Sequence, residues 1–166
     1  MRLRAFAACA LLLFLPACGN ESEAVPRRAV SKAVVSLPSQ VLGLKIVEEN
    51  VAGEVRGVSG TYLDSLGLFS FREEDDLLRG TLQVGRFNEV AEPERKRFRD
   101  AIIAQLGSTV PLQLYVGGRD VWLTSGTEQS IFTWFDPKGF YVLSVRSDYS
   151  FPRTLLRKLL EAEPLR

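Results

Sequence analysis

From Leu37 onward, hydrophobic and polar residues alternate mostly with a period of two, which is the period of a β-strand. The clearest case is a hairpin whose arms are residues 66–71 and 77–87, joined by the charged corner 72–76. A strand with a high density of Val, Ile and Leu, at residues 41–48, precedes this hairpin. The pattern predicts three antiparallel strands in this part of the chain.

A second set of short strands follows in the C-terminal half, and turn residues separate its members. The sequence Asp136-Pro137-Lys138-Gly139 is typical of a type I turn, with Asp, Pro and Gly at their preferred positions. The predicted strands of this meander are residues 112–116, 121–124, 130–135 and 140–146.

Two segments have the period of an amphipathic helix instead. The first begins at Pro93 and ends before Gly107, and the second begins at Pro152 and ends before Pro164. The expected buried stripe of the second helix is Leu155, Leu156, Leu159 and Leu160. Strands and helices do not alternate regularly along the chain, as they would in a parallel sheet. We therefore predict an α+β fold, a mostly antiparallel β-sheet of about 6–7 strands with two amphipathic helices packed on it.

The N-terminal residues have a different pattern, a short basic start followed by an unbroken apolar run. Arg2 and Arg4 precede the run, which covers residues 5–15. This run is too short to cross a bilayer, which requires about 20 apolar residues. Its length and its basic start are typical of a secretory signal peptide.

The apolar run ends in Leu15-Pro16-Ala17-Cys18-Gly19, which resembles the lipobox of bacterial lipoproteins. In such proteins the cysteine thiol receives a diacylglyceryl group, the peptide is cut before it, and the new amino end is often acylated. The resemblance implies lipidation of Cys18 and a lipid-anchored, extracytoplasmic protein at the cell membrane or outer membrane, because two acyl chains anchor a protein stably. The alternative is ordinary signal cleavage after Gly19, with small residues at −1 and −3.

These boundaries divide the chain into three parts. Residues 1–17 are the expected signal peptide. Residues 18–36 are polar, small and interrupted by Pro26, as expected of a lipidated N-terminus and flexible tether. Residues 37–163 are the expected single α+β domain.

Composition then excludes several kinds of chemistry. The 166 residues include 21 basic and 20 acidic ones and no histidine. The absence of histidine excludes Ser-His-Asp and Cys-His catalysis and imidazole metal sites. Cys9 and Cys18 both precede the predicted domain, so a disulfide or thiolate zinc site within it is excluded. The balanced charge gives no general attraction to nucleic acid. We expect no catalytic residue, cofactor, metal or nucleic-acid partner.

Aromatic residues are dense in the C-terminal half, and two tryptophans stand among polar neighbours. Trp122 and Trp134 are therefore candidate ligand-binding residues, although packing in the core is the simpler explanation for most aromatics of a sheet. The sequence predicts a noncatalytic, membrane-anchored envelope module that binds a protein partner or a ligand. The alternatives are a structural or assembly accessory of an envelope complex and, less favoured, a carboxylate-based hydrolase, for which no Asp or Glu is singled out.

Overall fold

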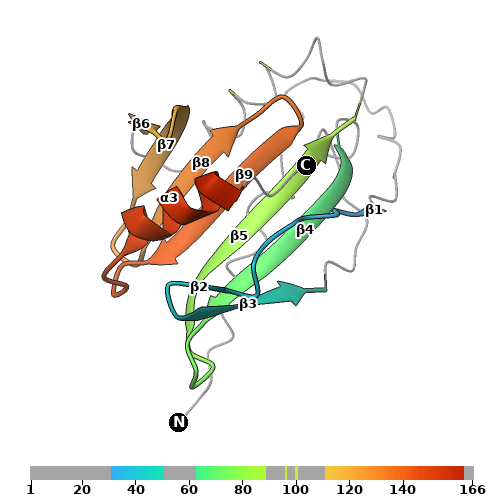
Figure 1. Ribbon diagram of the computed structural model, residues 1–166. Coiled ribbons are helices and arrows are strands. Elements are labelled where there is room, and N and C mark those ends of the chain that lie inside the picture. Colours follow the sequence, from blue (N-terminus) through green and yellow to red (C-terminus); the bar gives the residue numbers. More distant parts are fainter. Residues whose placement is uncertain (1–30, 51–62, 89–95, 97–99, 101–110, 163–166) are drawn as a thin grey trace, which may run out of the picture.

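The protein forms one large β-sheet with a helix across one face (Figure 1). The computed structural model describes residues 31–50, 63–88, 96, 100 and 111–162. In chain order, the elements are β1 (Ser31–Lys32), β2 (Gln40–Val41), β3 (Leu44–Glu49), β4 (Leu63–Arg72), β5 (Leu78–Phe87), β6 (Leu112–Val116), β7 (Arg119–Ser125), β8 (Gln129–Phe135), β9 (Gly139–Arg146) and α3 (Pro152–Ala162).

The sheet has nine strands among the described residues, and eight of them follow the order β2-β3-β4-β5-β9-β8-β7-β6. Every pair on this path is antiparallel, whereas β1 pairs with β4 in parallel. The N–H of Ala33 continues the β1 pairing by donating to the Leu66 carbonyl oxygen at 3.1 Å. Residues 31–33, which lie in the segment that we expected to be the flexible tether, therefore pair with the sheet.

The described residues form a mainly-β fold with one bounded helix, so the prediction of an α+β fold with two amphipathic helices is wrong. The strand number was underestimated because β1 and β2 have two residues each, too few to show a period. The helix expected from Pro93 lies outside the described residues except at Lys96 and Asp100, where the backbone is helical. The second predicted helix is confirmed as α3, and it buries Leu155, Leu156, Leu159 and Leu160.

Alternation along the strands sorts their side chains onto two faces of the sheet, and two neighbouring cross-strand rows illustrate the result. The first, which we name the apolar row, consists of Phe69, Leu82, Leu143, Phe132 and Leu123. The second, which we name the hydroxyl row, consists of Ser70, Thr81, Ser144, Ile131 and Thr124. Since each member of one row precedes or follows a member of the other along its strand, the two rows lie on opposite faces.

The apolar row lies on the face that α3 covers, which we name the helix face. The four buried leucines of α3 belong to the same core cluster as Phe69, Leu82 and Leu143. Val41 of β2 and Leu44 of β3 also belong to this cluster. Figure 1 shows α3 in front of β8 and β9, and the segment that leads to β2 in front of β4 and β5. The hydroxyl row lies on the other face, which we name the opposite face.

Candidate binding groove on the opposite face

A groove of about 760 Å³ lies at one end of the opposite face, along β5, β9 and β8. A volume of this size is within the range of small-ligand sites. Thr81 and Ser144 of the hydroxyl row line it together with Gln129 and the leucine pair Leu77 and Leu78. The groove therefore combines hydroxyl and amide groups with apolar surface.

Cross-strand pairing positions the polar side chains of the groove. Thr81 pairs with Ser144 across β5 and β9, and the Ser144 hydroxyl donates to Gln129 Oε1 at 2.6 Å. Gly80 also lines the groove. A Cβ at Gly80 would lie 2.6 Å from the Ser144 carbonyl oxygen, so only glycine allows β9 to approach this closely.

A network of charged side chains lies at the end of the groove. Arg79 donates to Glu73 Oε2 at 2.9 Å and to Asp148 Oδ2 at 3.1 Å. Arg146 donates to Asp148 Oδ1 at 3.1 Å. The hydrogen bond from Arg146 and the positive charges of Arg146 and Arg79 lower the pKa of Asp148. These four side chains balance two positive charges with two negative ones.

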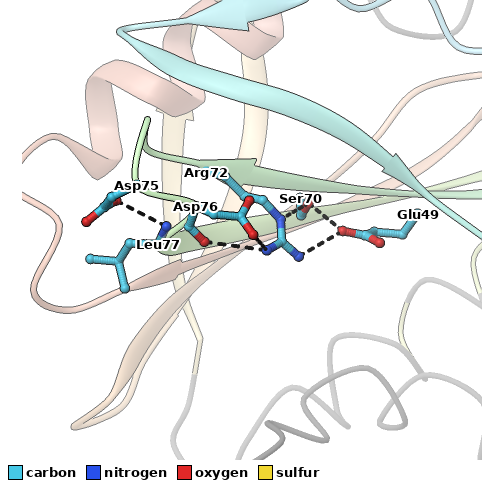
Figure 2. Close-up of polar contacts among 6 residues, drawn as sticks. All are labelled: Glu49, Ser70, Arg72, Asp75, Asp76 and Leu77. Carbon is cyan, nitrogen blue, oxygen red and sulfur yellow. Dashed lines mark hydrogen bonds and ion pairs between the residues drawn. The ribbon is translucent and has the colours of Figure 1, made fainter. Parts of the chain in front are cut away.

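A second polar cluster holds the β4–β5 corner next to the groove (Figure 2). The Ser70 hydroxyl donates to Glu49 Oε1 at 2.6 Å, and Arg72 donates to Ser70 Oγ at 3.0 Å and to Glu49 Oε1 at 3.2 Å. The Ser70 hydrogen bond, followed by the bond and charge of Arg72, lowers the pKa of Glu49. Arg72 also pairs with Asp76 at 3.3 Å. This cluster ties β3, β4 and the corner together.

Asp75 and Asp76 shape the turn between β4 and β5. Asp76 has a positive φ of 66°, a conformation that Asp tolerates better than most residues. The Leu77 N–H donates to Asp75 Oδ1 at 3.2 Å, which Figure 2 shows beside the arginine contacts. This places Leu77, whose side chain is 41% exposed, at the mouth of the groove.

The structure separates the two tryptophans that the sequence singled out. Val121 pairs with Trp134 and Trp122 pairs with Thr133, so the two indoles lie on opposite faces of the sheet. Trp134 is 0% exposed on the helix face and stacks on Tyr141, with ring centroids 4.9 Å apart and an interplanar angle of 3°. Its indole packs in the core and is not available to a ligand at the surface.

Trp122 is half-buried on the opposite face. Its ring contacts Phe135 edge-on, with the centroids 5.7 Å apart. It does not line the groove at β5, β9 and β8. A ligand-binding role for Trp122 stays a prediction.

Cys18 lies outside the described residues, so its lipidation also stays a prediction. Within the described ranges, no group of three or more Asp, Glu, Cys or His side chains could hold a metal ion. Within those same ranges, no helix is long and apolar enough to cross a membrane.

Sequence reasoning missed the groove because its walls come from segments far apart in the chain. Thr81 of β5 and Ser144 of β9, for example, both line the groove and pair across the sheet, although they are far apart in the sequence. The available signal was the alternation of Thr81 and Gln83 with apolar neighbours in β5, which indicated one polar face. No family model, curated protein or solved structure matches this chain.

Proposed function

We propose that the protein is a noncatalytic binding module of the bacterial envelope, held to a membrane through acylated Cys18. The groove on the opposite face, with its mixed hydroxyl, amide and leucine lining, is the observation that carries the binding role. The resemblance of residues 15–18 to a lipobox supports the anchor. In this proposal, the groove receives part of a protein partner or a small ligand outside the cytoplasm.

Two carboxylates, Glu49 and Asp148, are not suited to act as general acids. A general acid at neutral pH needs a raised pKa, whereas hydrogen bonds from Ser70 and Arg146 lower the pKa of Glu49 and Asp148 respectively. Glu49 is also paired with Arg72 of the neighbouring strand β4, and Asp148 is paired with Arg79 of β5. These groups therefore suit a structural role better than proton transfer.

The charges at the groove indicate the chemistry of the ligand. The network of Arg79, Arg146, Glu73 and Asp148 is balanced, but the groove lining also includes Glu128. Its surplus negative charge disfavours an acidic ligand. Leu77 and Leu78 offer apolar surface, and Thr81 offers a hydroxyl. We therefore expect a ligand segment without negative charge that has both apolar and hydrogen-bonding groups.

The anchor is tested by metabolic labelling with a fatty acid in a bacterial host. The parent chain should incorporate label into the membrane fraction, and Cys18→Ser should incorporate none. Cys9→Ser is the matched control and should label like the parent, because residue 9 lies in the part that is removed. Equal labelling of the parent and Cys18→Ser, or none in either, contradicts the anchor.

The groove is tested separately by site-specific photocrosslinking in cells. A benzophenone amino acid at Thr127, in the groove lining, should form a discrete adduct, whereas the same amino acid at exposed Arg153 on α3 should not. Adding Ser144→Trp, which fills the groove, should remove the adduct at Thr127. Identical adducts from both positions, or an adduct that survives Ser144→Trp, contradict binding in the groove.

A further inference from the structure

The two edges of the sheet are protected to different degrees. At one edge, β3 is partly covered by the two-residue strand β2, and Lys45, Glu48 and Glu49 place charges along it. At the other edge, β6 is a five-residue strand without a charged side chain. Among the described residues, no strand pairs with its outer side. An uncharged, uncovered edge strand is a template for pairing with another strand.

The hairpin turn decides which backbone groups of β6 point outward. Gly117 and Gly118 both have positive φ, 58° and 79°, as in a type I′ turn, and Val116 pairs with Arg119 across it. The residues that flank such a turn form a hydrogen-bonded pair, and hydrogen-bonded pairs then alternate along the ladder. The backbone N–H and C=O groups of Leu114 therefore form hydrogen bonds with β7. Those of Gln113 and Tyr115 point outward, away from β7.

We propose that β6 is a homodimer interface, in which β6 of a second copy pairs with it antiparallel about a two-fold axis at Leu114. In this register Gln113 of each copy lies opposite Tyr115 of the other copy, which gives two equivalent pairs. Each of these pairs exchanges both backbone bonds, giving about four interstrand hydrogen bonds. Leu114 lies opposite Leu114 of the second copy. The two form a non-hydrogen-bonded pair, in which side chains approach closely. This inference does not depend on the proposed groove or lipid anchor.

The side chains of β6 favour a second copy of the same strand as the occupant. Leu112 is 57% exposed and would lie opposite Val116 of the second copy, so an exposed apolar side chain meets an apolar partner on both sides of the axis. Tyr115 is 77% exposed and would pack beside Gln113 of the second copy. Because β6 carries no charge, the two-fold axis brings no like charges together across the new ladder.

The backbone part of the interface is tested with proline, which removes an N–H donor. Since the Gln113 N–H points away from β7, Gln113→Pro removes a donor from the interface and leaves the β6–β7 ladder intact. Gln113→Ala is the matched control, because both variants lose the side-chain bond to Asp120 (3.1 Å) and only Ala keeps the N–H. In sedimentation of the full chain in detergent, the parent should dimerise. The dissociation constant of the dimer should be at least about tenfold higher for the proline variant than for the alanine variant.

The register is tested with single cysteines under mild oxidation, on a Cys9→Ser, Cys18→Ser background of the full chain. Leu114→Cys should form a covalent dimer, and Gln113→Cys and Tyr115→Cys should form much less, because their sulfurs face each other only in the double variant. Circular dichroism of each variant confirms that the sheet is formed. A folded parent that stays monomeric at millimolar concentration overturns the proposal. Equal affinity of the proline and alanine variants, or cross-linking that does not peak at residue 114, also overturns it.

Discussion

The helix face and the opposite face are built from the same strands, yet they differ in what fills them. The apolar row packs in a core with the leucines of α3, and Leu82 and Leu143 in it are 0% exposed. One residue away along each of these strands, Thr81 and Ser144 of the hydroxyl row are half-buried and line the groove. The comparison separates a face that is packed by apolar side chains from a face that keeps half-buried hydroxyl groups accessible, which the proposed binding role would use.

This division is not complete, because the opposite face also has buried members. Phe140 and Thr133 both lie on it and are 2% and 0% exposed. The Oγ1 atoms of Thr133 and Thr124 are buried without a hydrogen-bond partner in the part of the chain that the structure describes. Such hydroxyls cost stability, whereas the apolar side chains of the helix face contribute to it.

The largest effect is expected from emptying a core position under α3. Leu156 is 1% exposed, so Leu156→Ala should lower the free energy of unfolding by about 2–5 kcal/mol, from lost burial and the cavity left behind. Urea denaturation followed by circular dichroism measures this. Arg157→Ala, on the exposed side of the same helix, should change it by about 0.5 kcal/mol or less. A Leu156→Ala variant as stable as Arg157→Ala would mean that α3 does not hold the helix face.

A smaller loss is expected on the opposite face at Gly85, which lies across from Phe140. A Cβ there would overlap the Phe140 ring, which is buried and has little room to move. Gly85→Ala should therefore cost about 1–3 kcal/mol, and adding Phe140→Leu should recover part of it in a double-mutant cycle.

Gly126→Ala is the matched control for Gly85→Ala. Its Cβ would meet the Gln129 carbonyl oxygen at an ordinary 3.6 Å, so its effect on the free energy of unfolding should be about 0.5 kcal/mol or less. Equal effects of the two alanine variants would contradict close packing of β5 against Phe140.

Replacing a buried hydroxyl that has no partner should raise stability. Thr133→Val keeps the shape of the side chain and removes the unpaired Oγ1, so we expect a gain of about 1 kcal/mol in the free energy of unfolding. Thermal unfolding at matched pH measures it. Ser70→Ala is the contrasting variant, because Ser70 bonds to Glu49 and its loss should destabilise. A loss of stability in Thr133→Val would show that its hydroxyl makes a favourable contact.

The smallest effect is a pH dependence from Glu49. Its pKa in the folded protein is lowered from the ordinary value of 4.5, so it contributes stability above that value and loses this contribution as the pH falls through the lowered pKa. The side chain is 35% exposed, so solvent screening limits the contribution to about 0.5 kcal/mol or less. Ser70→Ala should raise the pKa of Glu49, measured by carboxyl NMR titration. An unchanged pKa in this variant would contradict the assigned cause.

Local periodicity predicted the elements whose pattern is long enough to count. Helix α3 has the expected proline start and buried leucines. In the hairpin, Leu82 and Val84 share one face and Thr81 and Gln83 the other, as alternation predicted. Strands of two residues leave no such pattern, so β1 and β2 were not predicted. The fold class was wrong because two amphipathic helices were expected, whereas the described residues form a mainly-β sheet with one bounded helix.

The candidate site was harder to predict because it depends on contacts between distant segments. Polar neighbours suggested surface positions for Trp122 and Trp134, but Thr133 beside Trp134 is itself buried. One side of β5 pairs with β4, its neighbour in sequence, but nothing local indicates that its other side pairs with β9 rather than with β6. The pairing with β9 places Thr81 beside Ser144. The groove is formed by that pairing.

The sequence by itself determined which side chains share a face of each strand, because alternation is a local property of extended backbone. It also determined the absence of histidine and of cysteines after Cys18, and with it the chemistry that this chain cannot perform. Only the tertiary structure decided which face α3 covers, that Trp134 lies in the core, and that β6 is the last strand at its side of the sheet among the described residues. These features depend on the order of the strands, which is set by the burial of apolar area over the whole chain rather than by any single segment.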